Sequence, residues 1–229
     1  MQQVGGRVQA AWFICDALNA KKVVVGTLPN AFGRLQLTSY SKMQPGHYQY
    51  QTYALGQAQV GGGSTLFPLR ALASQRADGE LALANLGPPS GPDRAFTPPY
   101  LALKTEQDQT ACRWLAGTRV SGFTPWRSFV VTESASGVLT YQTFDFKDAA
   151  RTRVLDIDGT QRSSVPSIKI TGGTRTVNVA AQTFRFENAG YMYILRVPTC
   201  AAEATLSVLR DGRVIQRERV TGYTLSLVK

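Results

Sequence analysis

The sequence predicts a mainly β protein: an antiparallel β-sandwich or jelly-roll-like domain with a few short helices and long loops rich in Pro and Gly. Three observations support this fold class. Short segments in which apolar and polar residues alternate recur along the chain. Clusters of Gly, Pro, Asn and Asp separate these segments at the spacing typical of sandwiches and barrels. Thr, Tyr, Val and Phe, which favour strands, are abundant.

The second half of the chain has the clearest strand pattern. Strands are expected at residues 128–133, 137–146, 153–157, 167–171, 176–180, 183–187, 190–197, 204–209, 214–220 and 223–228. The dipeptide Asp211-Gly212 predicts a tight hairpin turn between residues 204 and 220. Within 137–146, Leu139 and Tyr141 share one parity and the following phenylalanines share the other, which predicts a bulge.

The first half is less regular. We expect strands at residues 23–27, 34–41, 48–55, 81–86 and 100–104, and helical segments at residues 10–20, 66–77 and within 108–116. Proline-rich segments at 87–92 and 97–99 predict a long loop, since Pro is excluded from central strands. We interpret residues 1–229 as a single β-rich domain, with a possible subdivision into an irregular part, 1–117, and an antiparallel part, 118–229.

The net charge is +10, from 25 Lys and Arg against 15 Asp and Glu. No basic run exceeds the pair Lys21-Lys22, so the sequence lacks the basic arm that many nucleic-acid-binding proteins use. The overall positive field still allows nucleic acid as a partner. No apolar run approaches the 18 residues of a membrane span, and residues 8–15 do not form a signal peptide.

Three cysteines, Cys15, Cys112 and Cys200, are widely spaced. An odd number at such spacing predicts no disulfide and no zinc site, and each thiol is expected to be a small buried apolar group in a reducing compartment. With a single histidine in the chain, we expect no metal and no cofactor.

His47 is the one histidine, and any Ser-His-Asp or Cys-His arrangement must use it. The residues on either side of His47 have the pattern of a β-strand. The sequence contains no Gly-x-Ser-x-Gly motif and no phosphate-binding loop. We therefore predict that the protein is not an enzyme.

The segment from Tyr40 to Tyr48, which contains Lys42, Gly46 and His47, resembles the Tyr-x-Lys-x-Gly-x-Tyr strand motif of jelly-roll alginate lyases. Two extra residues separate Lys42 from Gly46 here. The resemblance implies a protein that acts on an acidic glycan, with Tyr40, Lys42, His47 and Tyr48 as its site residues.

Three functions are consistent with these patterns. The first is a non-catalytic structural subunit, specifically a bacteriophage virion component of the capsid or tail, assembled in the host cytoplasm as a homo- or hetero-oligomer. The second is an extracellular jelly roll that binds or cleaves glycans, and the third is a nucleic-acid-binding β-barrel. For the first, the candidate interface residues are Met1, Tyr48, Tyr50, Phe96 and Tyr100, because aromatic groups and rigid Pro-rich loops suit subunit contacts.

Overall fold

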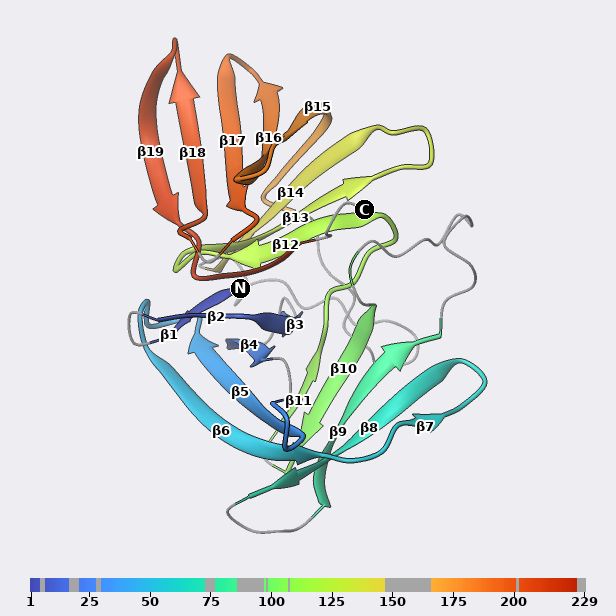
Figure 1. Ribbon diagram of the computed structural model, residues 1–229. Helices are drawn as coiled ribbons and strands as arrows, with labels where there is room; N and C mark the ends of the chain where they lie inside the picture. Colours follow the sequence, from blue (N-terminus) through green and yellow to red (C-terminus); the bar gives the residue numbers. More distant parts are fainter. Residues whose placement is uncertain are drawn as a thin grey trace.

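The computed structural model describes residues 1–4, 7–16, 21–27, 30–72, 77–85, 97, 99–106, 108–146, 166–200 and 202–225. These residues form two curled antiparallel sheets that lie one above the other (Figure 1). The architecture is sandwich- or barrel-like and confirms the predicted fold class.

The first sheet has nine strands over the described residues and uses the first half of the chain. Its order is β11-β10-β9-β8-β6-β5-β4-β3, with β7 paired to β8. The strands are β3 (Ala11–Cys15), β4 (Lys22–Thr27), β5 (Arg34–Ser41), β6 (Tyr48–Leu55), β7 (Gln59–Val60), β8 (Ser64–Ala71), β9 (Ala77–Ala84), β10 (Tyr100–Thr105) and β11 (Asp108–Ala111). The sheet curls so that β3, at one end of the order, lies against β10 near the other end.

The second sheet has eleven strands over the described residues, in the order β19-β18-β17-β16-β15-β14-β13-β12-β20-β1-β2. They are β1 (Gln2–Val4), β2 (Arg7–Gln9), β12 (Thr118–Phe123), β13 (Arg127–Glu133), β14 (Leu139–Asp145), β15 (Ile168–Val177), β16 (Ala181–Asn188), β17 (Tyr191–Pro198), β18 (Thr205–Arg210), β19 (Arg213–Arg219) and β20 (Gly222–Leu225). The first strands of the chain therefore join the sheet built by its second half, through β20.

Three buried clusters form the core, and the third of them joins the two sheets and places the candidate site. One fills the curl of the eleven-stranded sheet around Phe129, Tyr141 and Phe184. Another fills the curl of the nine-stranded sheet around Phe13, Leu35 and Leu69. The third lies between the sheets and comprises Val23, Val25, Tyr40, Phe123 and Phe146. Because the third cluster draws on both sheets, their junction is an apolar layer.

The hairpin predicted at Asp211-Gly212 is confirmed. β18 and β19 pair as neighbours, with Arg210 opposite Arg213. Asp211 and Gly212 have φ values of 51° and 73°, the left-handed region that this two-residue turn requires.

The predicted helices are wrong where the structure describes them. Residues 11–15 form β3, residues 64–71 form β8, and Asp108–Ala111 form β11. These segments contain Ala and other residues that are common in helices. Pairing with strands distant in sequence nevertheless makes them β-strands, because such pairing overrides local preference.

The bulge predicted within residues 137–146 is present on one side of β14 only, where the pairing with β15 shifts register between Leu139 and Thr140. β14 pairs with β13 without a shift from Leu139 to Asp145. The parity changes because both faces of β14 are buried: Tyr141 packs inside its own sheet, whereas Phe144 points toward the nine-stranded sheet and stacks on Arg113.

The two strands predicted at 167–171 and 176–180 are one strand, β15, which continues through Gly172-Gly173. A side chain at Gly173 would come within 2.2 Å of the Phe186 ring, so this glycine allows a core ring to lie against the backbone. The strand predicted at 153–157 and the Pro-rich segment 87–92 lie outside the described residues.

No helix in the described part of the chain has the length and apolar character needed to cross a membrane.

Candidate binding site at the junction of the sheets

A cavity of about 140 Å³ lies where the two sheets meet, and we call it the junction pocket. The nine-stranded sheet contributes Val23, Tyr40, Ser41, Gly46, His47 and Tyr48, and the eleven-stranded sheet contributes Phe123, Thr124, Pro125, Phe146 and Thr221. The pocket is thus lined by four aromatic rings, one imidazole and three hydroxyl groups. Aromatic walls with a few polar groups are typical of ligand and anchor-residue pockets.

The β5–β6 hairpin places three of these residues. Tyr40 and Tyr48 are cross-strand partners, and their ring centroids are 5.8 Å apart. The connecting turn is closed by the Ser41 hydroxyl, which accepts hydrogen bonds from the backbone N–H groups of Met43 and Gln44. Local hydrogen bonds within residues 41–44 therefore fix the turn that precedes His47.

Tyr40 forms the floor of the pocket. Its ring lies 5.0 Å from that of Phe123 between centroids, and its hydroxyl donates a hydrogen bond to Oε1 of the buried Gln2 at 3.2 Å. Burial, with a smaller contribution from the neighbouring Tyr48 hydroxyl, raises the pKa of Tyr40 above its usual value. The Tyr40 phenol is therefore held in its neutral form.

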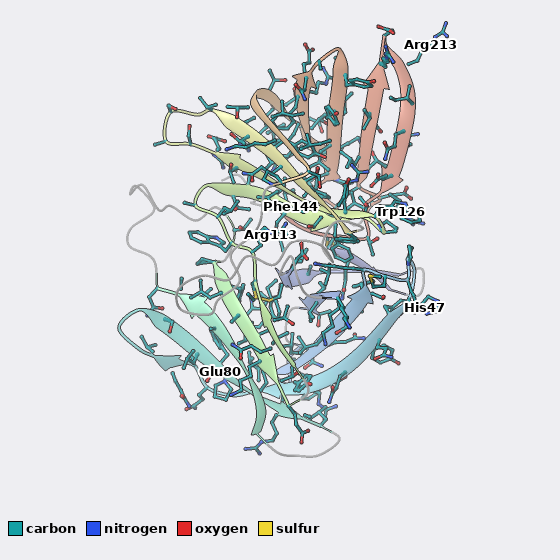
Figure 2. All side chains as sticks on the ribbon, turned by 180° about the vertical axis from the view of Figure 1, so that it is seen from behind. His47, Glu80, Arg113, Trp126, Phe144 and Arg213 are labelled. Atoms are coloured by element: carbon teal, nitrogen blue, oxygen red, sulfur yellow. A yellow bond between two sulfur atoms is a disulfide. The ribbon has the colours of Figure 1, made fainter. Side chains whose placement is uncertain are left out.

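Exposed apolar side chains occur on the segments that line the pocket: Met43 in the β5–β6 turn, Tyr48 and Tyr50 on β6, and Trp126 after Pro125, although Tyr50 itself lines a separate cavity of the nine-stranded sheet. The exposed fractions are 64% for Met43, 39% for Tyr48, 65% for Tyr50 and 57% for Trp126. Trp126 directly follows Pro125 of the pocket lining, and Figure 2 shows it on the same side of the molecule as His47. We call Met43, Tyr48, Tyr50 and Trp126 together the rim aromatic surface.

Lys42, although it lies in the same hairpin, is turned away from the pocket into a buried ion cluster. Its Nζ lies 2.5 Å from Oδ1 of Asp16, whose Oδ2 lies 3.2 Å from Nη2 of Arg113. Burial alone would raise the pKa of Asp16, but Lys42 and then Arg113 outweigh burial and lower it. All three side chains are buried, so the cluster is a fixed part of the junction.

Arg113 links this cluster to the eleven-stranded sheet. Its guanidinium lies 3.6 Å from the ring centroid of Phe144, and its Nη1 donates a hydrogen bond to the Ser128 hydroxyl at 3.0 Å. Arg113 comes from the segment that connects the two sheets, and it therefore ties β13 and β14 to Asp16 at the end of β3.

The prediction that the chain has no disulfide is wrong, because Cys15 and Cys112 are bonded to each other. The two residues are 97 positions apart, and each directly precedes a member of the ion cluster, Asp16 or Arg113. Curling of the nine-stranded sheet brings its ends together, which sequence spacing does not reveal. Cys200 is a free cysteine, but it is exposed, so the expectation that each thiol is buried is wrong for this residue.

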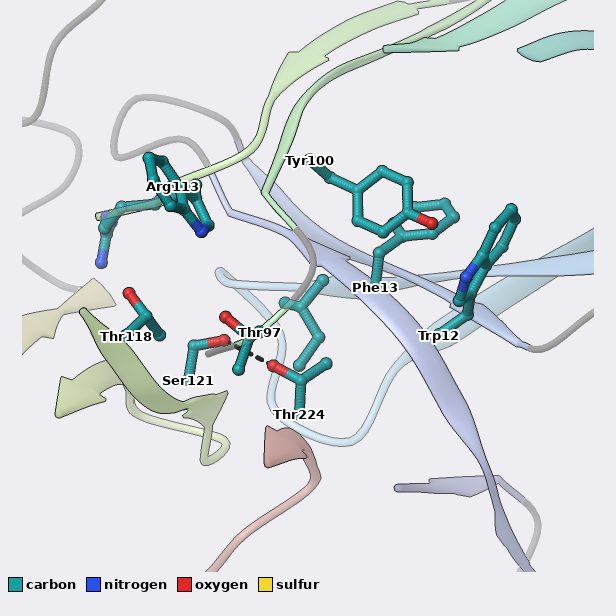
Figure 3. Close-up of a pocket in the computed structure, with 10 residues that line it drawn as sticks. Trp12, Phe13, Thr97, Tyr100, Arg113, Thr118, Ser121 and Thr224 are labelled. Atoms are coloured by element: carbon teal, nitrogen blue, oxygen red, sulfur yellow. Dashed lines mark hydrogen bonds between the residues drawn. The ribbon is translucent and has the colours of Figure 1, made fainter. Parts of the chain in front are cut away.

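A second, smaller cavity of about 20 Å³ adjoins Arg113 between the sheets (Figure 3). Trp12, Phe13, Tyr100 and Arg113 line it together with Ser121 and Thr224, whose hydroxyls are hydrogen-bonded at 2.8 Å. Its volume suits about one water molecule rather than an organic ligand.

The structure brings together some of the sequence-predicted residues and separates others. Tyr40, His47 and Tyr48 line one pocket, and Tyr50 lies on the same strand as Tyr48. Tyr100 is buried, 4% exposed, against Trp12 and Phe13. Phe96 lies outside the described residues.

Met1 also packs within its own chain. It is partly buried against the core of the eleven-stranded sheet, and its carbonyl accepts a hydrogen bond from the backbone N–H of Tyr223 at 2.7 Å. Among the described residues, no group of three or more His, Cys, Asp or Glu is placed to hold a metal ion.

Sequence reasoning missed Asp16, Arg113 and Trp126. The signal for the first two was the repeated pairing of a cysteine with a charged residue, Cys15-Asp16 and Cys112-Arg113. For Trp126, it was a tryptophan directly after a proline, two residues before the strand predicted at 128–133.

The fold and site thus define a protein of two curled antiparallel sheets with a pocket at their junction. Comparison with protein-family models, with curated proteins and with solved structures found no match to this chain.

Proposed function

We propose that the chain is a non-catalytic structural subunit that associates with further copies of itself through the rim aromatic surface, and that it belongs to the capsid or tail of a bacteriophage virion. The observation that carries the proposal is the exposure of Met43, Tyr48, Tyr50 and Trp126 beside the junction pocket. Tyr, Trp and Met are enriched at protein interfaces, and anchor side chains commonly fill pockets of this kind.

The arrangement also suits a preorganised contact. The pocket lining comes from two sheets whose relative position is held by the buried Asp16–Lys42–Arg113 cluster and an apolar layer. A partner that places an apolar side chain between Tyr48 and Pro125 would therefore meet walls that need no rearrangement.

The Cys15–Cys112 disulfide supports an oxidising setting for the folded protein. Such bonds persist on virion surfaces and in extracellular proteins. A virion assembled in the host cytoplasm and then released satisfies this requirement.

Sedimentation velocity over about a hundredfold range of protein concentration tests the proposal. We expect the sedimentation coefficient to rise with concentration as copies associate. A chain that remains a monomer at the highest concentration contradicts it.

A second candidate function, glycan binding, is favoured by a separate property of the same pocket. Its aromatic walls, from Tyr40, Tyr48, Phe123 and Phe146, lie beside the Ser41 and Thr221 hydroxyls. Rings that combine apolar faces with polar groups can stack on a sugar while the hydroxyls bond to it. Lys42, the cation that the resemblance to alginate lyases implies for an acidic sugar, is instead paired with Asp16.

The single histidine makes this alternative easy to test, because the imidazole NMR signals of the protein arise from His47 alone. Titration with neutral and uronate hexasaccharides shifts these signals if a glycan enters the pocket. Ultraviolet absorbance of the uronate sample reports any unsaturated product of a lyase reaction. Unchanged signals and absorbance, together with concentration-dependent association, favour the structural subunit.

A further inference from the structure

Four arginines lie on one face of the eleven-stranded sheet, on the side away from its own core. They are Arg185 on β16, Arg196 on β17, and Arg217 and Arg219 on β19. Their neighbours along the strands, such as Phe184, Phe186, Leu195 and Glu218, point inward and are buried. All four arginines are exposed, and we call them the arginine face.

Strand register places the four side chains in two adjacent rows. In one row, Arg196 and Arg219 are both opposite Thr205, on its two sides. In the next row, Arg185 is opposite Ile194, which pairs with Ser207, and Ser207 is opposite Arg217. Strands spaced by about 4.8 Å and rows spaced by about 6.7 Å put the guanidinium groups within reach of several charges of one polyanion.

The face keeps a positive surplus. Arg219 has an acidic partner, Glu203, at 3.1 Å in an exposed pair. Arg185, Arg196 and Arg217 have no ion pair within the part of the chain that the structure describes. Glu187 is the one further acidic side chain on the outer side of β16 to β19.

Protection of an open sheet edge does not account for this pattern. Charged residues on β19, the last strand in the sheet order, would discourage pairing with another chain. Arg185 and Arg196, however, lie on β16 and β17, which have paired neighbours on both sides. Charge on these inner strands needs another reason.

The residue types favour phosphate as the anion. β16 to β19 contain arginine but no lysine, and the planar guanidinium matches phosphate oxygens through two parallel hydrogen bonds. Thr205 lies between Arg196 and Arg219 in register, and Thr183 lies beside Arg196, so these two hydroxyl groups can also donate to phosphate, whereas Ser207 is buried.

The outer side of these strands carries no aromatic residue, since Phe184, Phe186 and Tyr193 pack in the core and Tyr191 shares the strand parity of Tyr193. Single-stranded nucleic acid is bound by stacking of its bases on aromatic rings, and sugars stack in a similar way. A face with arginine and hydroxyl groups but no rings favours the sugar–phosphate backbone of a duplex.

We propose that the arginine face binds the phosphate backbone of double-stranded nucleic acid without sequence preference. This site is distinct from the junction pocket, because none of the four arginines lines that pocket, although Arg219 is only two residues from the pocket residue Thr221. The inference does not depend on the proposed self-association.

Fluorescence anisotropy with a labelled duplex of about 25 base pairs and arbitrary sequence tests the proposal at about 50 and 200 mM salt. The test variant is Arg185→Gln, Arg196→Gln, Arg217→Gln. The control is Arg34→Gln, Arg70→Gln, Lys104→Gln, which removes the same charge from exposed positions of the nine-stranded sheet. Circular dichroism melting verifies that both variants remain folded.

We expect the test variant to bind at least about tenfold more weakly than wild type, and the control to differ by less than about threefold. The slope of log affinity against log salt should fall by about 2–3 in the test variant, close to one for each lost phosphate contact. Absence of duplex binding by the wild type, or equal weakening in both triple variants, overturns the proposal. Binding to heparin or a single strand but not to the duplex also overturns it.

Discussion

Cys15 and Cys112 are covalently joined across the two ends of the nine-stranded sheet. Cys15 is the last residue of β3, Cys112 follows β11, and these strands are the first and last of the sheet order. The ion pair between the next residues, Asp16 and Arg113, lies beside the bond. The same closure that curls the sheet therefore also places the charged cluster under the eleven-stranded sheet.

Loss of the disulfide is expected to destabilise the protein strongly. A bond that closes a loop of 97 residues is worth about 4–5 kcal/mol through restriction of the unfolded chain. Urea unfolding of Cys15→Ala, Cys112→Ala against wild type measures the difference. Cys200→Ala, at an exposed free cysteine, is the control and should be nearly neutral.

Thiol titration in denaturant tests the bond itself. One thiol, from Cys200, should react without reductant and three after reduction. Three reactive thiols in a sample never exposed to reductant would contradict the assigned bond.

Asp16 should make stability depend on pH in the acid range. Its folded pKa lies below the usual value of 3.8, so the unfolded chain takes up the proton first as pH falls. The stabilisation by Asp16 is present above about pH 4 and is lost as pH falls through the folded pKa. Urea unfolding of wild type between about pH 7 and pH 3 should show this loss.

Asp16→Asn leaves Lys42 and Arg113 buried without their carboxylate, which should cost about 3–5 kcal/mol at neutral pH and flatten the acid dependence. Asp211→Asn, whose side chain is 89% exposed, is the control and should change little. A wild-type acid profile with the same slope as that of Asp16→Asn would refute the role of this carboxylate.

Glu218 is expected to hold the curl of the eleven-stranded sheet. Its carboxylate accepts hydrogen bonds from Thr124 and Gln216, both at 2.5 Å, and pairs with Arg127 at 3.2 Å. Because β19 is far from β12 and β13 in sheet order, these contacts span the interior of the curl.

Glu218→Ala should therefore lower the free energy of unfolding by about 1–3 kcal/mol, since it removes one of the two carboxylates paired with Arg127, which keeps Asp145, and leaves the buried Thr124 hydroxyl without its acceptor. The matched variant Glu203→Ala breaks an exposed pair with Arg219 and should cost less than about 1 kcal/mol. Thermal melting followed by circular dichroism compares them. Similar losses of stability in both variants would show that the buried contacts of Glu218 stabilise the protein no more than an exposed ion pair does.

Local patterns predicted the β fold and singled out three residues that line the junction pocket. The Asp211-Gly212 turn depends on adjacent residues, and Tyr40, His47 and Tyr48 meet because one hairpin carries them. Such features need no knowledge of distant partners.

Features that depend on sheet closure could not be read in this way. The Cys15–Cys112 bond could be predicted only if one knew that the curl of the nine-stranded sheet brings its two end strands, β3 and β11, close together. Phe144 was misread because its strand is buried on both faces, and the second face is covered by Arg113 from the segment that connects the two sheets. Local alternation does not report such contacts.

The rim aromatic surface is the feature on which the proposed function depends, so its removal is the most direct test. Sedimentation velocity at high protein concentration should compare wild type, Tyr48→Ala with Trp126→Ala, and Phe32→Ala. Phe32 is 82% exposed but does not line the junction pocket, which makes it a matched aromatic control. We predict that wild type and Phe32→Ala associate, whereas the double variant stays a monomer with an unchanged circular dichroism spectrum. Association of the double variant to the same extent as wild type would contradict a structural role for this surface.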